Sequence, residues 1–251
     1  MPPDDAQSSA AVKPFLEHLE DLRWMLIKMI ATLGIAMVAC FFFASQLLRV
    51  LIYPLQRAAG DAEPFLRTLE VTGGFTVALK LALYAGVLVS CPLLLYFLAQ
   101  FVLPALTRRE KDILAPVLAS GVGLFLVGVA LAYWIVIPKA LRFFIEYNRH
   151  LHIRSEWTIQ NYVSFVTLIS LAFGVAFEMP MVVLALARLG IVTHHFLRHK
   201  RPYAIPLIFF VAAVITPPDL MSQILLGVPM CLLYEACIWI AWWMERRKAG
   251  A

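Results

Sequence analysis

The sequence predicts an all-α polytopic membrane protein, and two observations carry that prediction. The chain of 251 residues is 62% hydrophobic and only 15% charged, and its mean hydropathy is +0.81. Soluble domains are typically about 45–50% apolar and about 25% charged. The apolar residues also lie in blocks long enough to cross a bilayer as helices, which takes about 20 residues. The composition therefore excludes a cytosolic enzyme, a secreted disulfide scaffold and a nucleic-acid-binding domain.

The apolar blocks predict six transmembrane helices. Four long blocks come first, namely Met29–Leu48, Leu81–Thr107, Ile113–Pro138 and Trp157–Ala187, the last broken only by Glu178. Two further apolar stretches, Pro202–Pro218 and Leu220–Met244, follow them. We therefore expect spans at about 27–50, 78–105, 113–138, 160–187, 203–217 and 221–243, which form a single membrane domain over residues 14–243.

The fifth and sixth spans are short. Pro202, Pro206 and Pro218 confine the fifth, and Pro229 interrupts the sixth. A helix of about 15 residues covers only about 22 Å of a core that is about 30 Å thick. We therefore expect these spans to lie in thinned bilayer and to form one wall of a concave, cupped bundle.

The distribution of basic residues predicts the orientation. The N-terminal segment, residues 105–112 and 188–202, and the basic tail 244–251 carry 13 of the 21 Lys and Arg residues. Short loops rich in Lys and Arg stay in the cytoplasm. Both termini are therefore expected to be cytoplasmic.

The N-terminal segment divides in two. Residues 1–13 are polar and predict a disordered leader. Residues 14–27 place Phe15, Leu19, Leu22 and Leu26 at helical spacing, which predicts a short amphipathic helix at the cytoplasmic surface.

No enzyme motif and no metal-ligand spacing occurs in the chain, so we expect neither catalysis nor a metal or other cofactor. Carboxylates inside apolar blocks remain as candidates. Glu178 lies about ten residues inside the fourth span, where a carboxylate is costly and typically functional. The alternative is a neutral glutamic acid that hydrogen-bonds a backbone carbonyl near Pro180. Glu235 lies at a similar depth in the sixth span.

Other polar residues also have two interpretations. Asp219 and Gln223 mark the turn before the sixth span, where Asp219 equally fits a helix cap. Asp21 fits a solvated helix face, and Glu110 fits a neutralising contact among Arg108, Arg109 and Lys111.

Five segments nevertheless form one ordered pattern. They are Phe15–Arg23, Cys91–Glu110, Phe173–Pro180, Lys200–Tyr203 and Thr216–Gln223, and Pro229 with Leu233–Glu235 extends them. Their order and spacing over about 14–243 resemble the TatC family, the multispanning subunit of the twin-arginine protein translocase. One position departs from the family, which usually has glutamate where this chain has Asp21.

The resemblance implies a twin-arginine signal-peptide receptor of the bacterial inner membrane that exports folded proteins by means of the proton-motive force. It also implies TatB-like and TatA-like single-span partners, contact with lipid, and homo-oligomers within the complex. The site residues that it implies are Asp21, Glu110, Phe101, Arg23 and His18 for the signal peptide, Glu178 and Gln223 for a polar membrane cavity, and Pro54, Asp219 and Glu235 for partner or structural contacts.

Elementary chemistry agrees with a receptor. Two adjacent guanidinium groups stay ionised and offer planar donor pairs, so two separated carboxylates can take one arginine each. A proton- or ion-coupled small-solute transporter with Glu178 and Glu235 as carriers is the alternative. The absence of sequence repeats and of paired broken helices argues against it, and an intramembrane enzyme lacks a catalytic set.

Overall fold

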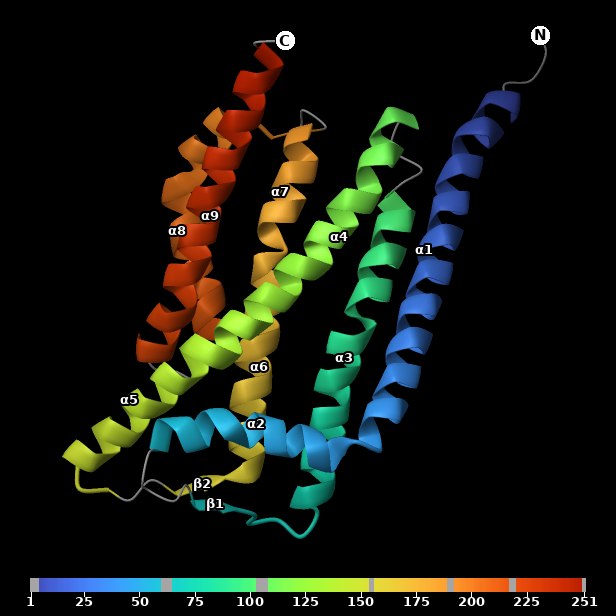
Figure 1. Cartoon of the computed structure of the whole chain (residues 1–251). Helices are drawn as coiled ribbons and strands as arrows, with labels where there is room; N and C mark the ends of the chain where they lie inside the picture. Colours follow the sequence, from blue (N-terminus) through green and yellow to red (C-terminus); the bar gives the residue numbers. More distant parts are fainter. Residues whose placement is uncertain are drawn as a thin grey trace.

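Among the residues that it describes, the computed structural model has helices and one short pair of strands, which confirms the predicted all-α class (Figure 1). It describes residues 5–59, 65–102, 108–153, 156–188, 192–216 and 220–249. In chain order the elements are α1 (Asp5–Phe41), α2 (Ala44–Ala59), β1 (Phe65–Arg67), α3 (Gly73–Val102), α4 (Arg108–Leu131), the π-helical segment η2 (Ala132–Val136), α5 (Ile137–His150), β2 (Glu156–Thr158), α6 (Ile159–Phe177), α7 (Met179–Arg188), α8 (His194–Ile215) and α9 (Leu220–Ala249).

Within the described residues, five helical stretches are long and apolar enough to cross a membrane. They are Leu19–Phe41, Gly73–Phe101, Ser120–His150, Ile159–Val183 and Leu220–Arg246. Helix α8 contains the expected fifth span but is not among them, since Arg198, Lys200 and Arg201 occupy its first half. In Figure 1 the lower ends of α8 and α9 lie well above the level of α2 and the strands.

The first helix differs from the expected segments at both ends. Helix α1 begins at Asp5, so the backbone is helical through residues 5–13 and continues through the amphipathic segment 14–27 into the span. It ends at Phe41, and α2 begins at Ala44 and lies across the lower ends of α3 and α6 (Figure 1). The apolar block expected as one span at 27–50 is therefore folded as two helices.

Helix α2 does not continue in the direction of α1, because α2 is amphipathic. Leu47, Leu51 and Leu55 share one face, and Leu51 and Leu55 are only 3% and 0% exposed. Arg49 and Arg57 are exposed on the other side. Such a helix is most stable at the boundary between an apolar core and a polar surface.

Helix α6 forms the centre of the core. Val163, Val166 and Phe173 are completely buried. At Gly128 an added Cβ would lie 2.6 Å from the carbonyl oxygen of Phe173, so glycine permits the close approach of α4 to α6. Helices α4 and α5 run on through η2 as one long helix, whereas α6 and α7 are separated at Glu178.

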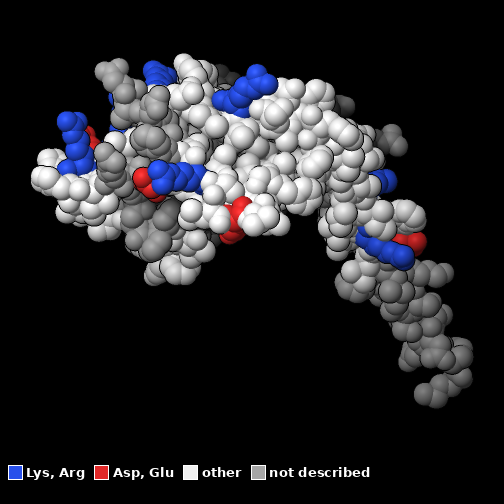
Figure 2. Space-filling model, turned by 90° about the horizontal axis from the view of Figure 1, so that it is seen from below, with Lys and Arg blue, Asp and Glu red and all other residues white. Residues whose placement is uncertain are grey.

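The two ends of the molecule differ. The first turns of α1 and the last turns of α9 lie at the same end (Figure 1). At the other end, β1 and β2 pair in parallel, with Phe65 opposite Glu156, and Arg67 forms an ion pair with Glu156 at 3.2 Å. Figure 2 shows this end, where the described charged side chains lie at scattered places, some of them as neighbours of opposite charge.

Candidate functional site

A pocket of about 260 Å³ opens between α1 and α3, toward the end that holds the start of α1. We call it the α1–α3 groove, and its lining residues are Asp21, Trp24, Met25, Lys28, Phe97, Gln100 and Phe101. Each helix contributes side chains spaced by three or four residues, which places them on one helical face.

The groove combines a carboxylate with aromatic and amide groups. Asp21 is exposed, and Trp24 is 55% exposed although it is a large aromatic residue. A guanidinium group can pair with a carboxylate and stack on an aromatic face at the same time. The arrangement is therefore suited to an arginine side chain of a bound peptide.

The groove brings together two of the residues expected to contact a signal peptide, Asp21 and Phe101. Arg23 is exposed on α1 outside the groove. The side chains of His18 and Glu110 lie outside the described residues, and their backbones belong to α1 and to the first turn of α4. In Figure 1 that turn of α4 lies at the same end of the molecule as the groove.

Sequence reasoning missed the remaining lining residues of the groove. Trp24, Met25 and Lys28 follow Asp21 at helical spacing, so a search along the face of Asp21 would have found them. Phe97 and Gln100 precede Phe101 at the same spacing. Pairing these two faces required the packing of α1 on α3, which one sequence does not reveal.

Glu178 lies at the junction of α6 and α7. Its N–H donates to the carbonyl of Val175, and Pro180 occupies the first turn of α7, where a missing N–H costs little. Both carboxylate oxygens are buried and have no hydrogen-bond partner among the described residues. A Cβ added at Gly121 on α4 would lie 3.1 Å from Oε2 and closer still to Sδ of Met181, so the carboxylate and the Met181 side chain both pack against α4 at this glycine.

Buried polar groups in proteins are nearly always hydrogen-bonded. The alternative in which Glu178 bonds a nearby backbone carbonyl is not the arrangement observed. Its carboxyl group is thus a buried polar group without a hydrogen-bond partner among the described residues.

Pro54 is buried within α2 and has a clear structural consequence. Proline lacks an N–H, so the carbonyl of Val50, four residues earlier, loses its helical partner. The hydroxyl of Tyr133, in the π-helical segment, donates to this carbonyl at 2.7 Å. The hydroxyl of Tyr162 donates to the adjacent carbonyl of Leu51 at 2.6 Å. The hydroxyl groups of Tyr133 and Tyr162 therefore hydrogen-bond α2 to the rest of the helical bundle.

We expect Tyr133→Phe to lower the free energy of unfolding by about 1–3 kcal/mol, because it leaves the carbonyl of Val50 without a donor. Chemical unfolding in detergent measures this change. Tyr53→Phe is the matched control, since Tyr53 is on α2 and its ring contacts Trp134. Equal stability of the two variants would contradict the role assigned to Tyr133.

Helices α8 and α9 are joined by polar contacts that include two expected site residues. Glu235 forms an ion pair with Arg201, and Gln223 donates to the carbonyl of Phe209 at 3.0 Å. Glu245 pairs with His194. Glu235 and Gln223 therefore contact α8, whereas Asp219 lies outside the described residues.

Comparison with known proteins places this architecture in a family. The family model described as "Sec-independent protein translocase protein (TatC)" matches residues 17–229. A TatC protein of Akkermansia muciniphila is 48% identical over 177 residues, or 70% of this chain, which spans about half (51%) of that relative's length. TatC proteins of Desulforapulum autotrophicum and Aquifex aeolicus are 36% and 34% identical, and the matches cover 90% and 94% of this chain and 83% and 97% of theirs.

A solved structure from the same family has a similar fold. The crystal structure of a twin-arginine translocase receptor, TatC, superposes with a TM-score of 0.82 at 34% identity, covering 89% of this chain and 97% of that one. The chain therefore belongs to the TatC family, and it is a multipass protein of the bacterial inner membrane that takes part in Sec-independent protein translocation.

Proposed function

We propose that the chain is the twin-arginine signal-peptide receptor of its translocase. The observation that carries this proposal is the α1–α3 groove, which unites Asp21, Trp24 and Phe101 in one pocket. A related protein of the same fold is described as a twin-arginine translocase receptor. Asp21 takes one signal arginine, and Glu110, at the start of α4, takes the other.

The proposed topology has six spans with both termini in the cytoplasm. Helix α8 is the short fifth span, and its apolar part after Arg201 is too short for an average bilayer core. The α8–α9 pair therefore lies in thinned bilayer as one wall of a concave bundle.

This wall receives TatB-like and TatA-like single-span subunits, and several copies of the chain assemble in the complex. Export of folded cargo is driven by the proton-motive force. Glu178 is the polar group of the cavity, and a partner helix or the inserted signal peptide supplies the hydrogen bond that it lacks.

Replacing Asp21 tests the receptor function. We expect Asp21→Ala to weaken binding of a labelled twin-arginine signal peptide by at least about tenfold, because a hydrogen bond to a charged group contributes about 1.5–3 kcal/mol. Asp21→Glu, which keeps the carboxylate, is expected to bind normally. Glu20→Ala is the matched control, since Glu20 is also exposed on α1 but does not line the groove. Equal losses in the Glu20 and Asp21 variants would rule out a specific contact at Asp21.

A further inference from the structure

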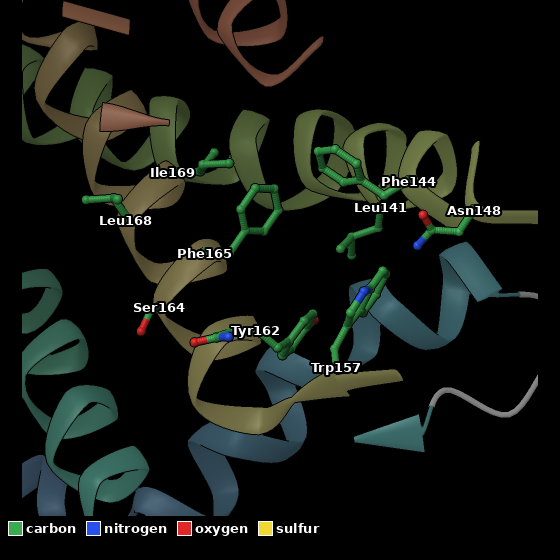
Figure 3. A pocket seen from close by; sticks show the side chains of 10 residues that line it. Leu141, Phe144, Asn148, Trp157, Tyr162, Ser164, Phe165, Leu168 and Ile169 are labelled. Carbon is green, nitrogen blue, oxygen red and sulfur yellow. The ribbon is translucent and has the colours of Figure 1, made fainter. Parts of the chain in front are cut away.

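A second and larger cavity lies between α5 and α6, toward the end of the molecule that holds β2 (Figure 3). Its volume is about 500 Å³. Sites for small ligands typically measure about 300–1,000 Å³. The volume is therefore sufficient for part of a lipid molecule.

The walls of this cavity are amphipathic along the helix axes. Leu141 and Phe144 on α5, and Phe165, Leu168 and Ile169 on α6, form an apolar wall toward the middle of both spans. Polar groups lie nearer the ends of the helices, with Asn148 late in α5 and Asn161 and Ser164 early in α6. Figure 3 shows Ser164, Tyr162 and Trp157 on the side of β2, and Ile169 and Phe144 on the opposite side. Along α6 the cavity thus has a polar end near β2 and an apolar end, whereas on α5 Asn148 lies beside Phe144 (Figure 3).

The ammonium group of Lys80 lies at the polar end of the cavity. Lys80 on α3 is exposed, and its Nζ donates a hydrogen bond of 2.6 Å to Oγ of Ser164, which lines the cavity. None of the residues that line the described cavity is acidic. The nearby carboxylate of Glu156 is paired with Arg67. Among the described residues Lys80 has no ion pair, so it brings a positive charge to the polar end that favours an anion.

We propose that this cavity binds an anionic phospholipid of the adjacent leaflet. The phosphate lies at Lys80, Ser164 and Asn161, and an acyl chain lies along the apolar wall toward the middle of the membrane. An ammonium group donates strong hydrogen bonds to a phosphate, and an indole such as that of Trp157 is typical of both membrane interfaces. The proposal is independent of signal-peptide recognition, because the cavity and the α1–α3 groove share no residue.

Lipid retention tests this proposal. The full chain, purified in detergent, is incubated with an equimolar mixture of phosphatidylglycerol and phosphatidylcholine, and bound lipid is counted by native mass spectrometry. We expect phosphatidylglycerol to be retained in preference, and Lys80→Gln to reduce that retention about fivefold through loss of one cationic charge. Lys139→Gln is the matched control, since Lys139 is an exposed lysine on α5 that does not line the cavity.

A second variant tests the apolar part. Leu168→Trp, at a 47% exposed position in the wall, is expected to reduce retention of the lipid. Val175→Trp is its control, because Val175 is exposed two turns further along α6 and outside the cavity. Unchanged retention in both Lys80→Gln and Leu168→Trp would overturn the proposal. A photoreactive residue at position 168 that captures a protein in cells, rather than a lipid, would also overturn it.

Discussion

Replacement of Glu110 by glutamine is expected to abolish binding of a twin-arginine precursor while leaving membrane insertion intact. Glu110 lies in the first turn of α4 among Arg108, Arg109 and Lys111. Its carboxylate offsets these cations, so its removal leaves only repulsion toward an arginine pair. The loss of precursor binding is expected to exceed that caused by Asp21→Ala. Three cations adjoin Glu110 in the sequence, whereas Lys28 is the one cation among the described residues that line the groove with Asp21.

Copurification of a tagged precursor with the membrane protein measures the effect. Glu146→Gln provides the control, since it removes the same charge from an exposed position on α5, away from the groove. Normal precursor binding and export by Glu110→Gln would exclude Glu110 from the signal site.

When Glu178 is replaced, the loss of transport activity is expected to depend on which residue takes its place. The carboxyl oxygens are buried and have no partner among the described residues, so in the assembled translocase they are expected to bond a group from another helix or peptide. Glutamine can supply an equivalent bond, and Glu178→Gln is therefore expected to keep substantial transport. Glu178→Ala leaves the partner unpaired at a cost of about 1–3 kcal/mol and is expected to be much worse.

Export of a folded reporter with a twin-arginine signal, at matched membrane levels, compares the two variants. The outcome also separates the two functional classes. A carboxylate that must gain and lose a proton in each cycle cannot be replaced by an amide. If glutamine proves as inactive as alanine, obligatory proton cycling at Glu178 becomes the better account of its role, and the proton-coupled alternative has to be reopened.

The second, third, fourth and sixth expected spans overlap helices that are long and apolar enough to cross a membrane, so hydropathy largely predicted them, whereas it did not predict the end of the first. The apolar run 29–48 contains no proline and no charge that would mark the break after Phe41. The break follows instead from the packing of Leu51 and Leu55 on the core, which only the folded bundle provides. The boundary between α6 and α7, by contrast, could be predicted from Pro180, because proline is favoured in the first turn of a helix.

Two residues of the α1–α3 groove were selected from the sequence, but the pocket that they share was not predictable. Asp21 and Phe101 were selected through the resemblance to the TatC family, and the structure places both in the α1–α3 groove. The burial of Glu178 inside an apolar block was also foreseeable. By contrast, the bond from Tyr133 to the carbonyl freed by Pro54 joins residues far apart in the sequence. Such partners depend on tertiary packing, which periodicity does not report.

Site-specific photocrosslinking from Trp24 tests the receptor function most directly. Trp24 is aromatic, 55% exposed and part of the groove, so a photoreactive phenylalanine analogue preserves its character. The same analogue at Leu26, which is 47% exposed on another face of α1, provides the control. The receptor account predicts adducts with a twin-arginine signal peptide from position 24 only, and their loss when both arginines are replaced by lysines. Adducts of equal yield from positions 24 and 26, or adducts insensitive to the arginine pair, would contradict it.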